Sequence, residues 1–250
     1  MHTADEYFDK VLNLMQRIRA EERDSIGRAA SKVADTIADG RLLHVFGTGG
    51  HSAIGAEEIF FRAGGLMAVN AILDEGVMLQ GGAFRSMNIE RTPGYARAVL
   101  DWYGVNEGDV LLIVNAYGIN AVTIDSALEG RRRGCTTIAV TSRELQAELP
   151  ADHPSRHPEG HNLADLADIV VDCKVPMGDA LVEIPGVTQR VGASSTYLNA
   201  LALNLITLGA ISRLADRGID PPIWQSANSP GGDEANQANI ADFRQRIKKL

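Results

Sequence analysis

The sequence predicts an α/β fold in which helices cover both faces of a parallel β-sheet. Five short apolar stretches are continuous in character, which is typical of strands buried on both faces. Segments with helical periodicity separate most of these stretches, as in chains that build parallel sheets. The prediction is a three-layer α-β-α sandwich with extra helices before the first strand. The expected strands are 42–46, 66–73, 109–116, 136–142 and 167–173.

The two helices expected before the first strand follow from periodicity and from a stop signal. Apolar residues recur every three or four positions over 4–20, which indicates an amphipathic helix. A second helix over 22–39 ends at Gly40, because glycine commonly stops a helix. Helices placed ahead of the first strand often pack against a partner subunit.

The remaining helices alternate with the strands. Residues 74–94 separate the second strand from the next helix and are expected to be rich in loops. The helix over 120–132 ends in three arginines and a glycine, so a basic end meets the negative end of the helix dipole. The helices expected after the first strand are about 52–62, 94–103, 120–132, 192–217 and one from about 233.

The whole chain, 1–250, is interpreted as one domain. A chain of 250 residues can bury roughly 70–75% of its extended surface, so it needs neither a disulfide nor a metal ion to fold. We find no repeat of fixed period and no low-complexity linker. The domain divides into a helical hairpin at 4–39, an α/β core at 41–217, and a C-terminal tail with a helix at 218–250.

Charge and composition indicate a cytoplasmic protein that binds neither nucleic acid nor membranes. The net charge of −8 disfavours polyanionic surfaces, and the N-terminal residues lack the apolar core of a signal peptide. Cys135 and Cys173 form no CxxC pair and are expected to be buried, reduced thiols. The longest apolar stretch, 197–211, is shorter than the roughly 20 residues that span a bilayer, so we expect a buried helix.

The loop GTGGHS at 47–52 is the first candidate binding site. It follows the first strand and opens a helix, and ligands of parallel sheets bind beyond the carboxyl ends of the strands. Its glycines permit close approach of the backbone, and the helix start offers N–H groups to an anion. The loop matches neither the P-loop nor the dinucleotide fingerprint, and a glycine turn without a ligand is the alternative. The candidate binding residues are Gly49, Gly50, His51 and Ser52.

Two further polar helix starts favour a ligand over a simple turn. The stretch NAYGIN follows the third strand, and VGASST opens the long helix with three adjacent hydroxyl groups. Capping a helix needs only one hydroxyl, so we expect that a ligand shares the others. The candidate binding residues are Asn115, Tyr117, Gly118, Asn120, Ser194, Ser195 and Thr196.

Taken together, these motifs resemble the SIS (sugar isomerase) domain family of phosphosugar isomerases and phosphosugar-binding proteins. The resemblance is closest to a bacterial branch of sugar isomerase domain proteins related to phosphoheptose isomerase. It covers nearly the whole chain, and the last of the matching segments is the most specific for the branch. The segments are FGTGGHSAIGAEEIFFRAGGL at 46–66, LIVNAYGIN at 112–120, LADIVVDCKVPMGDA at 166–180 and SANSPGGDEAN at 226–236.

The resemblance implies a five-stranded parallel sheet of order 2-1-3-4-5, in a homodimer or homotetramer. It also implies that the loops 47–52 and 115–120 and the hydroxyls at 194–196 surround a sugar phosphate. One departure concerns the phosphate loop, which is usually Ser-x-Ser-Gly-x-Thr in the family. Here Asn115, Tyr117 and Asn120 replace those hydroxyl residues. The ligand could therefore carry a phosphate, another anion such as a sulfonate or carboxylate, or no anion.

Aldose–ketose isomerisation through an enediol needs a base and an acid, and it requires no metal or cofactor. Glu57 and Glu58 lie on the helix that starts at the glycine loop, and only one of two adjacent positions can face a site. Surface charges are the alternative for both, and their glutamine variants are expected to lose turnover if one is the base. Glu90, which follows a glycine-rich loop, is a second candidate base; an ion pair is its alternative.

Histidines supply the candidate acids. His153, His157 and His161 recur every four residues, but the prolines between them disfavour a helix, so we predict no metal site. We expect His157 or His161 to reach the site, with a solvated loop as the alternative. Asp179 could contact sugar hydroxyls, although turn formation or helix capping explains it equally well.

The sequence thus predicts an isomerase of sugars or phosphosugars. A non-catalytic phosphosugar sensor is the first alternative, and it is disfavoured because no DNA-binding segment accompanies the domain. A phosphosugar lyase or etherase is the second, since elimination needs the same proton abstraction. Hydrolase and metalloprotease activities are disfavoured because the G-x-S-x-G and HExxH motifs are absent from the sequence.

Overall fold

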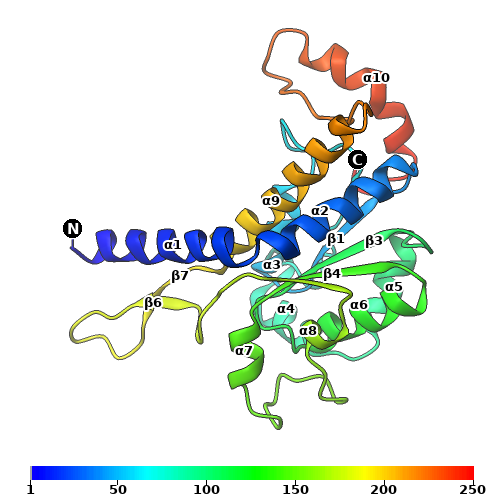
Figure 1. Cartoon of the computed structure of the whole chain (residues 1–250). Coiled ribbons are helices and arrows are strands. Elements are labelled where there is room, and N and C mark those ends of the chain that lie inside the picture. The colour runs from blue at the N-terminus through cyan, green and yellow to red at the C-terminus, as the bar shows by residue number, and fades with distance from the viewer. Residues whose placement is uncertain (1) are drawn as a thin grey trace.

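The computed structural model describes residues 2–250 and contains a five-stranded parallel sheet (Figure 1). The strand order is β2-β1-β3-β4-β5, and all neighbouring strands are parallel. Strand β1 therefore lies inside the sheet, with β2 added on one side of it and β3, β4 and β5 on the other. The predicted strands and their order are confirmed. Their bounds are β1 (Leu43–Gly47), β2 (Val69–Ile72), β3 (Val110–Val114), β4 (Thr136–Thr141) and β5 (Ile169–Asp172).

Helices cover both faces of the sheet, which confirms the three-layer sandwich (Figure 1). Alternate side chains of a strand enter opposite hydrophobic clusters. In β3, Leu112 joins one cluster, whereas Leu111 and Ile113 join the other. One face packs against α2 (Arg23–Ala38), α3 (Ser52–Glu58) and α9 (Ser195–Asp216); the other packs against α5 (Tyr95–Trp102), α6 (Ala121–Arg132) and α8 (Leu163–Leu166).

Several elements differ from the sequence expectations. The segment expected as loop, 74–94, contains a helical turn η1 (Leu79–Gly81) and a helix α4 (Ala83–Glu90). Gly81 and Gly82 made this segment resemble a loop in the sequence. In the structure, the Ser86 hydroxyl donates a hydrogen bond to the Val77 carbonyl at 2.7 Å and holds α4 in place. Further elements are α1 (His2–Glu21), α7 (Arg143–Glu148), the antiparallel pair β6 (Ala180–Val182) and β7 (Val191–Ala193), and α10 (Gly232–Arg244).

The long helix α9 is a packing helix of the sandwich. It spans 22 residues and extends beyond both ends of the apolar stretch 197–211. Within residues 2–250 it is the one helix that is long and apolar enough to cross a membrane by those two criteria. Leu198, Ala202 and Ile206, one turn apart, are buried against α2 and α3. Its apolar character is therefore explained by burial inside the fold.

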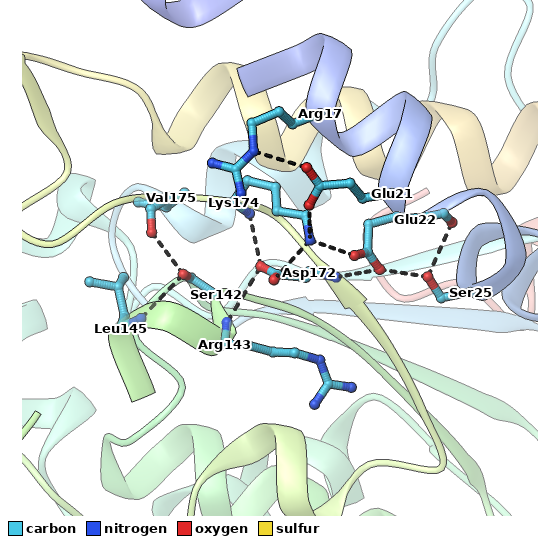
Figure 2. A network of polar contacts seen from close by, with 10 residues as sticks. All are labelled: Arg17, Glu21, Glu22, Ser25, Ser142, Arg143, Leu145, Asp172, Lys174 and Val175. Carbon is cyan, nitrogen blue, oxygen red and sulfur yellow. Dashed lines mark hydrogen bonds and ion pairs between the residues drawn. The ribbon is translucent and has the colours of Figure 1, made fainter. Parts of the chain in front are cut away.

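Figure 2 shows a polar network that ties the junction of α1 and α2 to the end of β5. The Lys174 ammonium lies 2.6 Å from Glu22 Oε1, 3.1 Å from Asp172 Oδ2 and 3.1 Å from Glu21 Oε2. Burial alone would disfavour this cation, but hydrogen bonds to the three carboxylates outweigh it and raise the pKa of Lys174. The Asp172 backbone N–H also donates to Glu22 Oε2 at 3.2 Å. The network therefore fixes the path of the chain as it leaves the sheet.

Candidate functional site

A pocket of about 290 Å³ lies beyond the carboxyl ends of β1 and β3, where the strand order reverses. This volume is near the lower end of the range of small-molecule sites, which suits a ligand the size of a monosaccharide. The loop after β1, the helix α4, the loop after β3 and the start of α9 form its walls. Of the residues predicted from the sequence, those lining it are Gly49, Gly50, His51, Ser52, Glu90, Asn115, Tyr117, Asn120 and Ser195.

Glu90 is the carboxylate that reaches the pocket from the end of α4. The Gly50 backbone N–H donates to Glu90 Oε1 at 3.1 Å. The Ser86 hydroxyl lies 3.3 Å from the same oxygen, but its single hydrogen has a closer acceptor in the Val77 carbonyl. Within the described residues, Glu90 Oε2 accepts no hydrogen bond from the protein. The carboxylate is therefore held by one oxygen and can act through the other.

The glycines of the first loop make room for the Leu79 side chain of η1 and the Glu90 side chain of α4. A Cβ atom at position 49 would lie 3.0 Å from Glu90 Oε2, and one at position 50 would lie 2.4 Å from Leu79 Cδ2. Neither glycine has a positive φ angle, so close approach rather than turn geometry requires them. The sequence prediction expected this space to receive an anion. In the structure, the Glu90 carboxylate and the Leu79 side chain pack against these two positions instead.

Burial raises the pKa of Glu90, and the hydrogen bond from Gly50 only partly offsets this effect. A carboxyl group whose pKa is higher in the folded state stabilises the fold fully below its unfolded pKa and loses this contribution as pH rises through the folded pKa. The Glu90→Gln variant does not titrate. We therefore expect its melting temperature to rise relative to the wild type as the pH increases from about 4.5, the ordinary pKa of a glutamate, into the neutral range.

The measurement is a thermal melt of both proteins at several pH values. Glu57→Gln removes an exposed carboxylate and serves as the control. A constant difference between Glu90→Gln and the wild type over this pH range would contradict the assigned burial of Glu90.

The loop after β3 is stabilised by its own side chains. Asn115 Oδ1 accepts the Gly118 backbone N–H at 2.9 Å. Gly118 has a φ of 62° and lies under Gln146 and Thr141, so it shapes the loop without lining the pocket. Burial raises the pKa of Tyr117, and the neighbouring Asp179 carboxylate adds to this effect. The loop therefore presents amide and phenol groups where the family usually presents hydroxyls.

The start of α9 is capped by Asp179, which lines the pocket from the segment after β5. Its Oδ1 accepts the backbone N–H groups of Ser194 at 2.9 Å and Ser195 at 2.7 Å. Its Oδ2 accepts the Ser195 hydroxyl at 2.7 Å. Ser194 is buried, and neither it nor Thr196 lines the pocket. The capping interpretation of Asp179 is thus confirmed, and only Ser195 of the three hydroxyls reaches the pocket.

Glu57 and Glu58 lie at the last turn of α3, outside the pocket. Glu57 is exposed, and Glu58 Oε1 lies 3.6 Å from Arg62 Nη2 on the surface. The helix starts at the pocket but runs away from it, so residues one to two turns along are carried out of reach. The geometry gives no support to a catalytic role for either carboxylate in this pocket.

The two histidines predicted as catalytic acids, His157 and His161, also lie outside the pocket. His157 is buried, and its Nε2 lies 3.1 Å from Asp125 Oδ1. Its Nδ1 accepts the Glu159 backbone N–H at 3.1 Å, so both ring nitrogens serve the local structure. The ring of His161 is partly exposed beside Glu159. Within residues 2–250, no three histidine, cysteine or acidic side chains gather to hold a metal ion.

Two residues of α4 that the sequence analysis did not single out, Ser86 and Met87, line the pocket beside the predicted Glu90. Ser86 and Glu90 are four residues apart, a spacing that places two side chains on one face of a helix. A helix predicted over 83–90 would have placed Ser86 and Glu90 on one face, but the preceding glycines favoured a loop.

A larger hollow of about 610 Å³ lies between α1 and β6. It is lined by the charged face of α1, including Glu6 and Lys10, which form an ion pair with each other. The lining of this hollow contains none of the site residues predicted from the sequence. The pocket at β1 and β3 therefore remains the candidate site.

Comparisons with known proteins identify the family to which the chain belongs. Residues 6–142 match the model of the SIS domain. A UPF0309 protein of Brucella anthropi is 38% identical over 247 residues, covering 98% of each chain, and one of Geobacillus thermodenitrificans is 36% identical over 246 residues, covering 98% of this chain and 97% of its own.

Solved structures share the fold at low sequence identity. Phosphoheptose isomerase from Neisseria gonorrhoeae has a TM-score of 0.56 at 15% identity, with 84% of this chain and 97% of that chain covered. The Vibrio vulnificus NanR protein, solved in complex with ManNAc-6P, has a TM-score of 0.51 at 12% identity, with 98% and 70% covered. With its matching domain, its sheet order and these relatives, the chain belongs to the SIS domain family.

Proposed function

We propose that this protein is an aldose–ketose isomerase that acts on a sugar or phosphosugar by enediol proton transfer. The observation that carries the proposal is Glu90, a carboxylate of raised pKa inside a pocket of monosaccharide size. A base is most useful when its pKa lies close to the working pH, and burial moves a glutamate in that direction. The phosphoheptose isomerases among the fold neighbours make this reaction class a natural one for the family.

In the proposed reaction, Glu90 Oε2 removes the proton from C2 of an aldose. The electron pair of that C–H bond forms the C1=C2 double bond, and the C1 oxygen takes a proton to give the enediol. The C2 hydroxyl then loses its proton as the C2 carbonyl forms, and Glu90 returns its proton to C1. His51, which lines the same pocket, is proposed to exchange protons with the two oxygens.

The other polar groups of the pocket are proposed to orient the sugar. Ser52, Asn115, Asn120 and Ser195 supply hydroxyl and amide groups that suit a polyol. We propose no metal or cofactor, since a carboxylate and a histidine suffice for this proton transfer. We also propose a cytoplasmic homo-oligomer; its free thiols Cys135 and Cys173 are both buried, which suits a reducing compartment.

The proposal is tested by incubating the protein with a panel of aldoses, ketoses and their phosphates in deuterated water. The expected result for a substrate is a product of conserved skeleton in which solvent deuterium appears at the exchanged carbon. Elimination would instead release a smaller fragment and would identify a lyase. A ligand that raises the melting temperature without any exchange would identify a binding or sensor protein. Either of these results overturns the isomerase proposal.

A further inference from the structure

The start of α9 is occupied by an anion that belongs to the chain itself. A helix N-terminus is a common place for a phosphate, because its first N–H groups point outward. Here the Asp179 carboxylate accepts hydrogen bonds from the backbone N–H groups and the hydroxyls of Ser194 and Ser195, with donor–acceptor distances between 2.7 and 3.0 Å. A phosphate placed there would have to displace a carboxylate that is held by four donors.

In the loop after β3, one backbone donor is likewise satisfied by a side chain of the chain itself. Asn115 Oδ1 takes the Gly118 N–H, which is a central donor of the loop. At the glycine loop, Glu90 Oε1 takes the Gly50 N–H. In each of the three segments that border the pocket, a side-chain oxygen of the chain therefore already accepts a backbone donor.

The charges around the pocket also disfavour a phosphate. Glu90 and Asp179 both line it, whereas no lysine or arginine is among its described lining residues. His51 is the one basic side chain there. A phosphate dianion would be confined beside two acidic groups, and such like-charge contacts discriminate strongly against a ligand. Sugar hydroxyls meet no such barrier, because they donate hydrogen bonds to carboxylates.

From these contacts we infer that the pocket selects an unphosphorylated sugar over the corresponding sugar phosphate. The inference rests on the proposed function because it concerns the same pocket. It states which ligand binds there, and not which reaction follows. It assigns Asp179 as the residue that determines this specificity. The phosphosugar specificity of other proteins with this fold is thereby not carried over to this chain.

The test is the affinity of the wild-type protein for matched pairs, namely glucose, mannose and N-acetylglucosamine, each with its 6-phosphate. We expect any pair that binds to favour the unphosphorylated member by at least about tenfold in Kd. A tighter or equal Kd for the phosphate would overturn the inference. Binding is measured apart from turnover, so a sugar that binds without isomerising would contradict the proposed function and leave the inference intact.

The Asp179→Asn variant tests the residue assignment. Asparagine keeps an oxygen for the Ser194 and Ser195 N–H groups but removes the charge, so the preference for the unphosphorylated member should shrink severalfold. Asp216→Asn, at the exposed far end of the same helix, is the matched control and should keep the wild-type preference. An unchanged preference in Asp179→Asn would overturn the role of Asp179. The wild-type comparison remains decisive if that variant fails to fold.

Discussion

Replacing Glu90 by glutamine is expected to lower kcat by about 100-fold or more, because general acid–base groups contribute 10²–10⁴-fold to a rate. Glutamine retains an oxygen that can accept the Gly50 N–H, so the side chain keeps its place. The Kd for the sugar should change little, since the amide keeps the shape of the carboxyl group. The measurement is kcat, together with ligand binding, for a substrate found by the deuterium-exchange assay.

The matched controls are Glu57→Gln and Glu58→Gln, which remove the carboxylates that the sequence favoured as bases. Both residues lie outside the pocket, so both variants should retain nearly full activity. If either control loses turnover while Glu90→Gln keeps it, the base is misassigned. The three variants thus separate the assignment drawn from the structure from the one drawn from sequence spacing.

Replacing Lys174 by methionine is expected to destabilise the fold by about 3 kcal/mol. The variant leaves Glu21, Glu22 and Asp172 close together without their shared cation. Removing one partner of a buried ion pair costs roughly 3–5 kcal/mol, and the partly exposed side of this network favours the lower end. The measurement is the free energy of unfolding from denaturant titrations at pH 7.

The effect of Lys174→Met should depend on pH. In the wild type, the contact with Lys174 lowers the pKa of Glu22 against the opposing effect of burial, so this group stabilises the fold above its unfolded pKa. That contribution is lost as the pH falls below about 4.5, so the difference in stability between variant and wild type should narrow below this pH. Lys249→Met, whose ammonium is 3.9 Å from Glu75 on the surface, is the control and should cost less than about 1 kcal/mol. A similar cost for both variants would refute the network as a structural anchor.

The sheet could be predicted from sequence because its signal is local and strong. Each strand is a short apolar run, and burial on both faces leaves no polar alternation to confuse it. The pair β6 and β7 was not foreseen, since three-residue strands are too short to show a period of two. Their pairing depends on contacts between segments rather than on a pattern within either one.

The pocket was predicted in part, and the reasons differ between residues. The strand ends and their loops point to Gly50, Asn115 and Ser195, because topology alone places such loops at one edge of the sheet. Choosing among Glu57, Glu58 and Glu90 required knowing how α4 folds over the glycine loop. His157 has the right chemistry, but its contact with Asp125 depends on tertiary structure that no spacing reveals.

The contacts of the glycine loop with η1 and α4 have a consequence for how this pocket can diverge over evolutionary time. Position 49 has room for no side chain while Glu90 lies against it, and position 50 has room for none while Leu79 does. A larger residue at position 49 therefore requires the Glu90 carboxylate to move, and one at position 50 requires the Leu79 side chain of η1 to move. A substitution at position 49 is thus expected to change the position of the proposed base, so the loop and the base should diverge together.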